Sequence, residues 1–139
     1  MVLHYSSLLF GIVSMAGQGT WVCPAFTTLM GLSIINHSVC KPNTLEKHIV
    51  RGIDMTLAHV IYALAIKEAF RLSKKNMYDL RILGFWKSSA YTVLAWLSGI
   101  TRIPGIYGEI AHASIHLSGS VGMLLLMQAG GWRRLPPPH

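Results

Sequence analysis

The chain has 139 residues, of which 52% are hydrophobic and only 12% are charged, and its formal net charge is +7. Soluble domains carry about 25% charged residues, so the composition excludes an ordinary soluble domain and indicates a membrane protein. The length fits a single domain, residues 1–139. The basic residues stand at the ends of apolar stretches rather than among exposed aromatic residues, which argues against nucleic acid as a partner.

Four apolar stretches follow one another along the chain, and each predicts a membrane-spanning helix. A helix needs about 20 mainly apolar residues to cross the hydrocarbon, and none of the stretches alternates as a strand does. The first is interrupted only by small residues and Pro24. The sequence predicts an all-α integral membrane protein whose four transmembrane helices cover residues 7–36, 50–72, 82–103 and 106–129.

Basic residues are distributed unequally between the two predicted sides of the membrane. The loop after the second helix and the C-terminal tail hold most of them, namely Lys67, Arg71, Lys74, Lys75, Arg81, Lys87, Arg133 and Arg134. Four spans put both termini on this side, which the positive-inside rule assigns to the cytosol or a matrix. The N-terminus lacks the basic region and cleavage site of a secretory signal. By analogy with small basic helical subunits, we expect the mitochondrial inner membrane.

The polar residues inside the predicted helices belong to one end of the bundle. Ionisable side chains within a membrane are costly, and they usually face the bundle interior beside a partner. Three of them share one face of the last helix at positions i, i+3 and i+7. We therefore expect these side chains to converge: Ser33, His37, Asp54, Glu109, His112 and His116.

The chemical types in this group fit a zinc site. Three histidines and a water are a known set of catalytic zinc ligands, which makes His37, His112 and His116 candidate metal ligands. Asp54 is then a candidate base or orienting residue for that water, and Ser33 a hydrogen-bonding partner. In the alternative interpretation the histidines bind no metal and act as polar glue between helices. The residues alone leave both interpretations open.

These residues resemble the metal-binding signature of the CREST superfamily, which includes the alkaline ceramidases, the hemolysin III-like proteins and the progestin and adipoQ receptors. The resemblance comprises Ser-x-x-x-His in SIINH (33–37), the aspartate of RGID 17 residues after that histidine, and His-x-x-x-His in HASIH (112–116). The spacing from His37 to Asp54 is similar to that of the adipoQ receptor branch.

The resemblance implies that His37, His112 and His116 match zinc ligands, and that Ser33 and Asp54 match the residues holding an activated water. The implied activity is hydrolysis of a lipid amide such as ceramide. Members of the superfamily form seven-helix bundles, whereas this chain has four apolar stretches. We therefore expect the lipid-holding cavity to be incomplete.

Other chemistries have weaker support. The Glu109-x-x-His112 pair is of the di-iron type, but such sites need the motif twice and further carboxylates, and the chain has five acidic residues. Haem ligation by His59 opposite His37 has no further signature in its favour. Gly119 and Gly122 predict a surface where another helix packs closely.

Two functional hypotheses follow. The first, which the sequence favours, is a small accessory subunit of a large membrane complex, with other subunits and lipids as partners and a CREST-like polar cluster that either holds zinc or does not. The second is a zinc-dependent hydrolase of a lipid amide. A bundle of four helices encloses a lipid poorly, and for that reason the hydrolase comes second.

Overall fold

The computed structural model of the chain describes residues 2–132, apart from the side chain of residue 4, and this part contains helices and no strands. The α-helices are α1 (Val2–Ser7), α2 (Leu9–Ala16), α3 (Val22–Ile34), α4 (Leu45–Lys75), α5 (Leu80–Leu97) and α6 (Ile106–Gln128). A π-helical turn, η1 (Ile35–Val39), extends α3, and a 3₁₀ turn, η2 (Ile100–Arg102), separates α5 from α6.

Three helical segments are long and apolar enough to cross a membrane: Val22–Val39, Leu45–Lys75 and Ile106–Gln128. The described residues thus confirm the predicted class, an all-helical protein with helices that can span a bilayer. The third predicted span, residues 82–103, is not among these segments. Its region forms α5, which ends at Leu97, where the chain turns through the left-handed Gly99 into η2.

The prediction of one helix over residues 7–36 is wrong, because the chain reverses direction between α2 and α3. Gly19 adopts a positive φ of 79° in this turn, a conformation that glycine adopts without steric cost. Pro24 does not interrupt a helix but lies in the first turn of α3, where a missing backbone N–H leaves no hydrogen bond unmade. The stretch therefore forms a helical hairpin.

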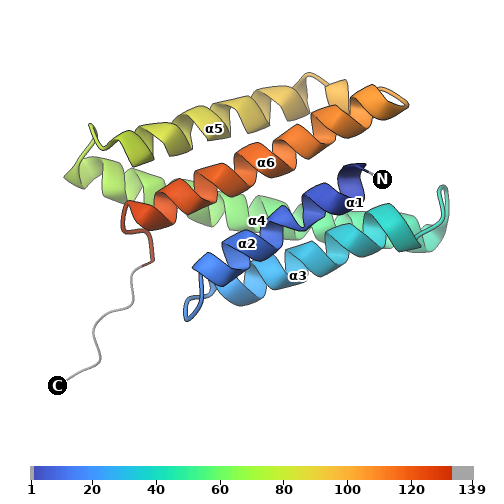
Figure 1. Cartoon of the computed structure of the whole chain (residues 1–139), viewed down its shortest axis with the longest axis horizontal. Coiled ribbons are helices and arrows are strands. Elements are labelled where there is room, and N and C mark those ends of the chain that lie inside the picture. The colour runs from blue at the N-terminus through green and yellow to red at the C-terminus, as the bar shows by residue number, and fades with distance from the viewer. Residues whose placement is uncertain (1, 133–139) are drawn as a thin grey trace.

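The helices pack side by side with roughly aligned axes, and α3, α4, α5 and α6 each run opposite to the helix before them (Figure 1). α6 lies between α5 and the α1–α2 segment, and α3 packs against both α2 and α4. The hairpin puts two segments of opposite direction, α1–α2 and α3, where one helix was predicted. As a result, α1 begins at the end of the bundle where α6 begins, and α6 finishes at the opposite end (Figure 1). The arrangement of the described residues therefore does not confirm the prediction that both termini share one side. Arg133 and Arg134 lie outside the described residues.

Capping side chains set the boundaries of the middle helices. Thr44 accepts a hydrogen bond from the Lys47 backbone N–H at 3.2 Å, so α4 begins five residues earlier than the predicted start at 50. Asp79 caps α5 in the same way through the Arg81 N–H. Hydrogen bonds from the Arg81 guanidinium also lower the pKa of Asp79 to about 2. The fourth predicted helix, 106–129, agrees with α6.

The apolar core occupies one half of the bundle. Its buried side chains come from α2, the first half of α3, the second half of α4, the start of α5 and the end of α6: Phe10, Val13, Val22, Phe26, Leu29, Ile61, Ala65, Ala69, Leu72, Ile82, Phe85, Met123 and Leu126. In antiparallel helices these segments all lie towards the end that carries the α4–α5 turn. The polar residues singled out in the sequence lie in the opposite half.

We predict that Gly108→Ala destabilises the protein. A Cβ atom at this position in the first turn of α6 would overlap the backbone carbonyl oxygen of Ile103, which cannot move as a flexible side chain can. The expected loss is about 1–3 kcal/mol of unfolding free energy, typical of overpacking. The measurement is denaturation in detergent followed by circular dichroism.

Gly119→Ala is the matched control on the same helix, because a Cβ there meets no atom within 4 Å. This variant should be as stable as the wild type or slightly more so, since alanine is the better helix former. Equal stability of the two variants would contradict the proposed close contact at residue 108.

Candidate metal centre

Three histidines from two segments meet in the polar half of the bundle. His37 lies in η1, and His112 and His116 lie one turn apart on α6. One ring nitrogen of each residue can be chosen so that the three atoms lie within 4.8 Å of one another. Within the part of the chain that the structure describes, this is the one group of three or more potential ligand side chains.

The rings face one another edge to face. Ring centroids are 5.2 Å apart for His37 and His112, 6.0 Å for His37 and His116, and 4.8 Å for the pair on α6. Zinc–nitrogen bonds of about 2.0–2.1 Å place tetrahedral ligand atoms about 3.3 Å apart. The three ligand atoms, which lie within 4.8 Å of one another, would have to move closer together to hold one ion.

The π-helical turn η1 positions His37. The Cys40 N–H donates to the Ile35 carbonyl at 3.0 Å, five residues back, which widens the last turn of this helix. Single π turns inside α-helices are frequent at functional sites. The wider turn changes the direction of His37 relative to Ser33, which still lies on the regular part of α3.

His116 is the most enclosed of the three and has a partner on α1. Its exposed fraction is 8%, and its ring packs against Phe10 with centroids 4.8 Å apart. Its Nδ1 lies 2.9 Å from the hydroxyl oxygen of Ser6. The neighbouring Ser7 makes an equivalent hydrogen bond of 2.7 Å to the hydroxyl of Ser33, which is 1% exposed. The short first helix therefore contacts two of the predicted site residues.

Asp54 is held close to the histidines but is not one of the potential ligands. The side-chain amide of Asn36 donates to Asp54 Oδ2 at 3.3 Å, and the Lys47 ammonium donates to the Asn36 backbone carbonyl. Asn36 thus links η1 to α4 beside His37. This position suits a residue that orients or deprotonates a water rather than a metal ligand.

The donor set fits a metal by a direct structural criterion. His37 Nε2 is buried and has no hydrogen-bond partner among the described residues, and the same holds for the side-chain oxygen of Asn36. A buried polar atom without a partner costs free energy. Three neutral imidazoles with one such unmatched nitrogen are suitable ligands for zinc.

A largely apolar cavity of about 410 Å³ adjoins the cluster. Asp54, His112 and His116 line it together with mostly apolar and aromatic residues of α2–α6: Phe10, Phe26, Leu29, Met55, Ala58, His59, Ile61, Tyr62, Thr92, Val93, Trp96, Leu97, Ile115, Gly119 and Met123. Its volume falls in the range of small-molecule sites, about 300–1,000 Å³. We had expected an incomplete cavity from a bundle this small, and this space is partly open rather than enclosed.

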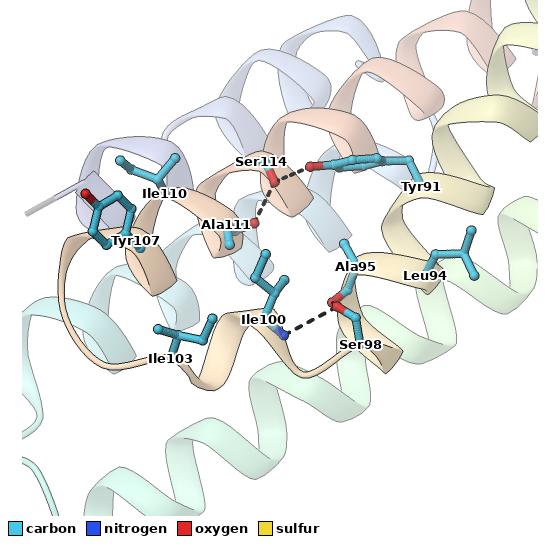
Figure 2. A pocket seen from close by; sticks show the side chains of 10 residues that line it. All are labelled: Tyr91, Leu94, Ala95, Ser98, Ile100, Ile103, Tyr107, Ile110, Ala111 and Ser114. Carbon is cyan, nitrogen blue, oxygen red and sulfur yellow. Dashed lines mark hydrogen bonds between the residues drawn. The ribbon is translucent and has the colours of Figure 1, made fainter.

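A second hollow of about 520 Å³ lies between α5, η2 and α6 (Figure 2). It is larger than the cavity beside the histidines, but the hydroxyl groups of Tyr91, Ser98 and Ser114 in its lining already have hydrogen-bond partners. Tyr91 Oη lies 2.7 Å from Ser114 Oγ, which also donates to the Ala111 carbonyl, and Ser98 Oγ accepts from the Ile100 N–H. None of the three clustered histidines lines it. We therefore take the cavity beside the histidines, rather than this second hollow, as the candidate functional site.

The structure also places the residues of the weaker hypotheses. His59 Nδ1 donates to the Met55 carbonyl of its own helix at 2.6 Å, and its ring packs against Trp96. Gly122 packs closely on α5 as predicted, because a Cβ there would contact Ser88 at 3.3 Å. Gly119 does not pack in this way and borders the cavity instead.

Sequence reasoning missed Ser6, Ser7 and Asn36. Ser6 precedes the first predicted helix and Ser7 is its first residue. An asparagine next to a candidate ligand, such as Asn36, does not by itself indicate a role in a site. The adjacent serines in an otherwise apolar segment were the available clue, since buried hydroxyls in membrane helices usually bond across to another helix.

The comparisons with known proteins identify no relative: no family model, curated protein or solved structure matches this chain.

We predict that the purified chain binds one zinc ion and that His116→Ala abolishes this binding. The reason is the loss of one of three converging ligands. His59→Ala is the matched control, because it removes a histidine from the same cavity but not from the cluster. Elemental analysis after gel filtration provides the measurement.

A His112→Gln variant separates the metal site from polar glue. The amide keeps a hydrogen bond but is a poor zinc ligand, so zinc should be lost while the protein stays folded. Wild-type protein without zinc would support the interpretation of HASIH as polar glue between helices.

Proposed function

We propose that the chain is a zinc-dependent membrane hydrolase acting on a lipid amide, with ceramide as an example of the class. The observation that carries the proposal is the position of His112 and His116, two of the three clustered histidines, at the wall of an apolar cavity. A site with convergent polar groups beside an apolar pocket is typical of enzymes that bind an apolar substrate. The substrate class follows the CREST resemblance.

The cavity supports a substrate with a long apolar part. Its lining is dominated by apolar and aromatic side chains, while its acidic and imidazole groups come from α4 and α6. A lipid tail would bury apolar surface there, and its polar linkage would lie beside Asp54, His112 and His116. Burial of each methylene contributes about 0.8 kcal/mol.

The proposed chemistry divides between the ion and the protein. When bound, Zn²⁺ would supply Lewis-acid chemistry, polarising a carbonyl and lowering the pKa of a water. Asp54 would accept the proton of the attacking water and pass it to the amine that leaves when the C–N bond breaks. Asn36 would hold the carboxylate in place through its hydrogen bond to Oδ2.

The accessory-subunit hypothesis, with a mitochondrial inner-membrane location and four spans, stays a prediction. It concerns neighbouring proteins, and nothing in the described residues favours it specifically. Large apolar side chains exposed on α4 and α5, such as Ile53, Val60 and Leu94, suit lipid and a protein neighbour equally. The apolar cavity beside the histidines supports the hydrolase, because it offers an apolar substrate a place to bind.

We predict that Asp54→Asn lowers hydrolysis of a lipid amide by at least about 100-fold, the usual contribution of a general base. Zinc content should not change, because Asp54 is outside the ligand set. Release of fatty acid from ceramide in nanodiscs is the measurement. Glu46→Gln, an exposed carboxyl on the same helix, is the control. No detectable hydrolysis by zinc-loaded wild-type protein would refute the proposal.

We further predict that Gly119→Leu changes the preferred acyl-chain length. The position lines the cavity and offers room for a side chain, so leucine should fill part of the space and favour shorter chains. Zinc content should equal that of the wild type. Gly119→Ala should keep the wild-type preference. An unchanged chain-length profile in Gly119→Leu would mean that the tail lies elsewhere.

A further inference from the structure

Two adjacent serines on α1 make parallel hydrogen bonds into the polar cluster. Ser6 Oγ lies 2.9 Å from His116 Nδ1, and Ser7 Oγ lies 2.7 Å from Ser33 Oγ. Each of these hydroxyls also donates to the backbone carbonyl of Leu3, at 3.0 Å and 2.9 Å. Both serines are buried, with exposed fractions of 9% and 0%.

A count of protons relates the direction of the bond to His116 to the second contact of Ser6. A serine hydroxyl has one hydrogen. The Leu3 carbonyl can only accept, so both contacts of Ser6 Oγ are hydrogen bonds at the same time when its hydrogen is directed to that carbonyl. The remaining contact between Ser6 Oγ and His116 Nδ1 is then a hydrogen bond only if the imidazole nitrogen carries the proton and the hydroxyl oxygen accepts.

We propose that Ser6 is a positioning residue that holds His116 in the Nδ1–H tautomer and so keeps Nε2 free to bind the metal. The proposal rests on the proposed function for its use, but the tautomer itself does not depend on metal. A neutral imidazole has one protonated and one unprotonated ring nitrogen. In metal sites the tautomer of a histidine ligand is set by the partner of its other nitrogen.

Packing around His116 supports this role. The ring is clamped between Ser6 and Phe10, whose ring centroid is 4.8 Å away. Both contacts come from the N-terminal segment, and the rings of His37 and His112 lie with their centroids 6.0 Å and 4.8 Å from that of His116. The partner of His116 Nδ1 is therefore supplied by α1, outside every segment of the resemblance.

The same geometry gives Ser7 a related effect. Because its own hydrogen is directed to the Leu3 carbonyl, the hydrogen in its bond with Ser33 must come from Ser33. The oxygen of Ser33 then keeps lone pairs that can accept from a water. α1 thus sets the proton positions of two groups in the site.

The first test reads the tautomer directly in the full chain. Protein labelled with ¹⁵N-histidine, without metal, is measured in detergent by two-bond ¹H–¹⁵N correlation, and His116 is assigned from its loss in His116→Gln. A protonated Nδ1 and an unprotonated Nε2 are expected. A protonated Nε2 in the wild type would overturn the proposal. This readout stands even if the chain binds no zinc, in which case only the proposed function fails.

The second test measures zinc affinity by competition with a chelator. Ser6→Ala should bind zinc about 10–100-fold more weakly, as is usual when the partner of a ligand histidine is removed, and Ser6→Thr should restore the affinity. Ser14→Ala is the matched control: Ser14 is 7% exposed and makes a comparable hydrogen bond of 2.6 Å to Thr27, but does not contact the cluster. Wild-type affinity and tautomer in Ser6→Ala would overturn the proposal.

Discussion

The need to match polar groups inside an apolar bundle governs this structure. A hydrocarbon environment supplies no hydrogen bonds, so each polar side chain placed there needs a partner within the protein. The chain concentrates these groups in one half of the bundle, where α1, η1, α4 and α6 meet. Hydroxyls there are paired, and an asparagine bridges α4 to η1. The buried atoms without a hydrogen-bond partner among the described residues include two in η1, His37 Nε2 and the side-chain oxygen of Asn36.

The polar half and the apolar half depend on each other through α2, α3 and α6. Phe10 belongs to the core, contacts His116 and lines the cavity. Met123 on α6, four residues after Gly119, likewise belongs to the core and lines the cavity. Side chains of the core therefore form the floor of the cavity, and the histidines form part of its wall. A small bundle obtains a binding space in this way without additional helices.

The sequence predicted the helical class, the last helix and the approach of His37, His112 and His116 to one another. These follow from hydropathy and from the cost of ionisable groups in membranes. It did not predict the reversal at Gly19, because small residues are as common within membrane helices as between them. Nor did it predict η1, since a π turn depends on one shifted hydrogen bond. Ser6 was missed because its significance lies in a contact with a residue 110 positions away.

The separation of core from site has a consequence for how such a chain can diverge. Substitutions around the histidines leave the packed end of the bundle, with Phe85, Leu126 and their neighbours, untouched. Proteins tolerate change where the remaining structure keeps its stability above a threshold. The polar half can therefore exchange its ligands or reshape its cavity while the helices stay assembled. An inventory of sequences with this fold should show chemistry varying at one end and architecture persisting at the other.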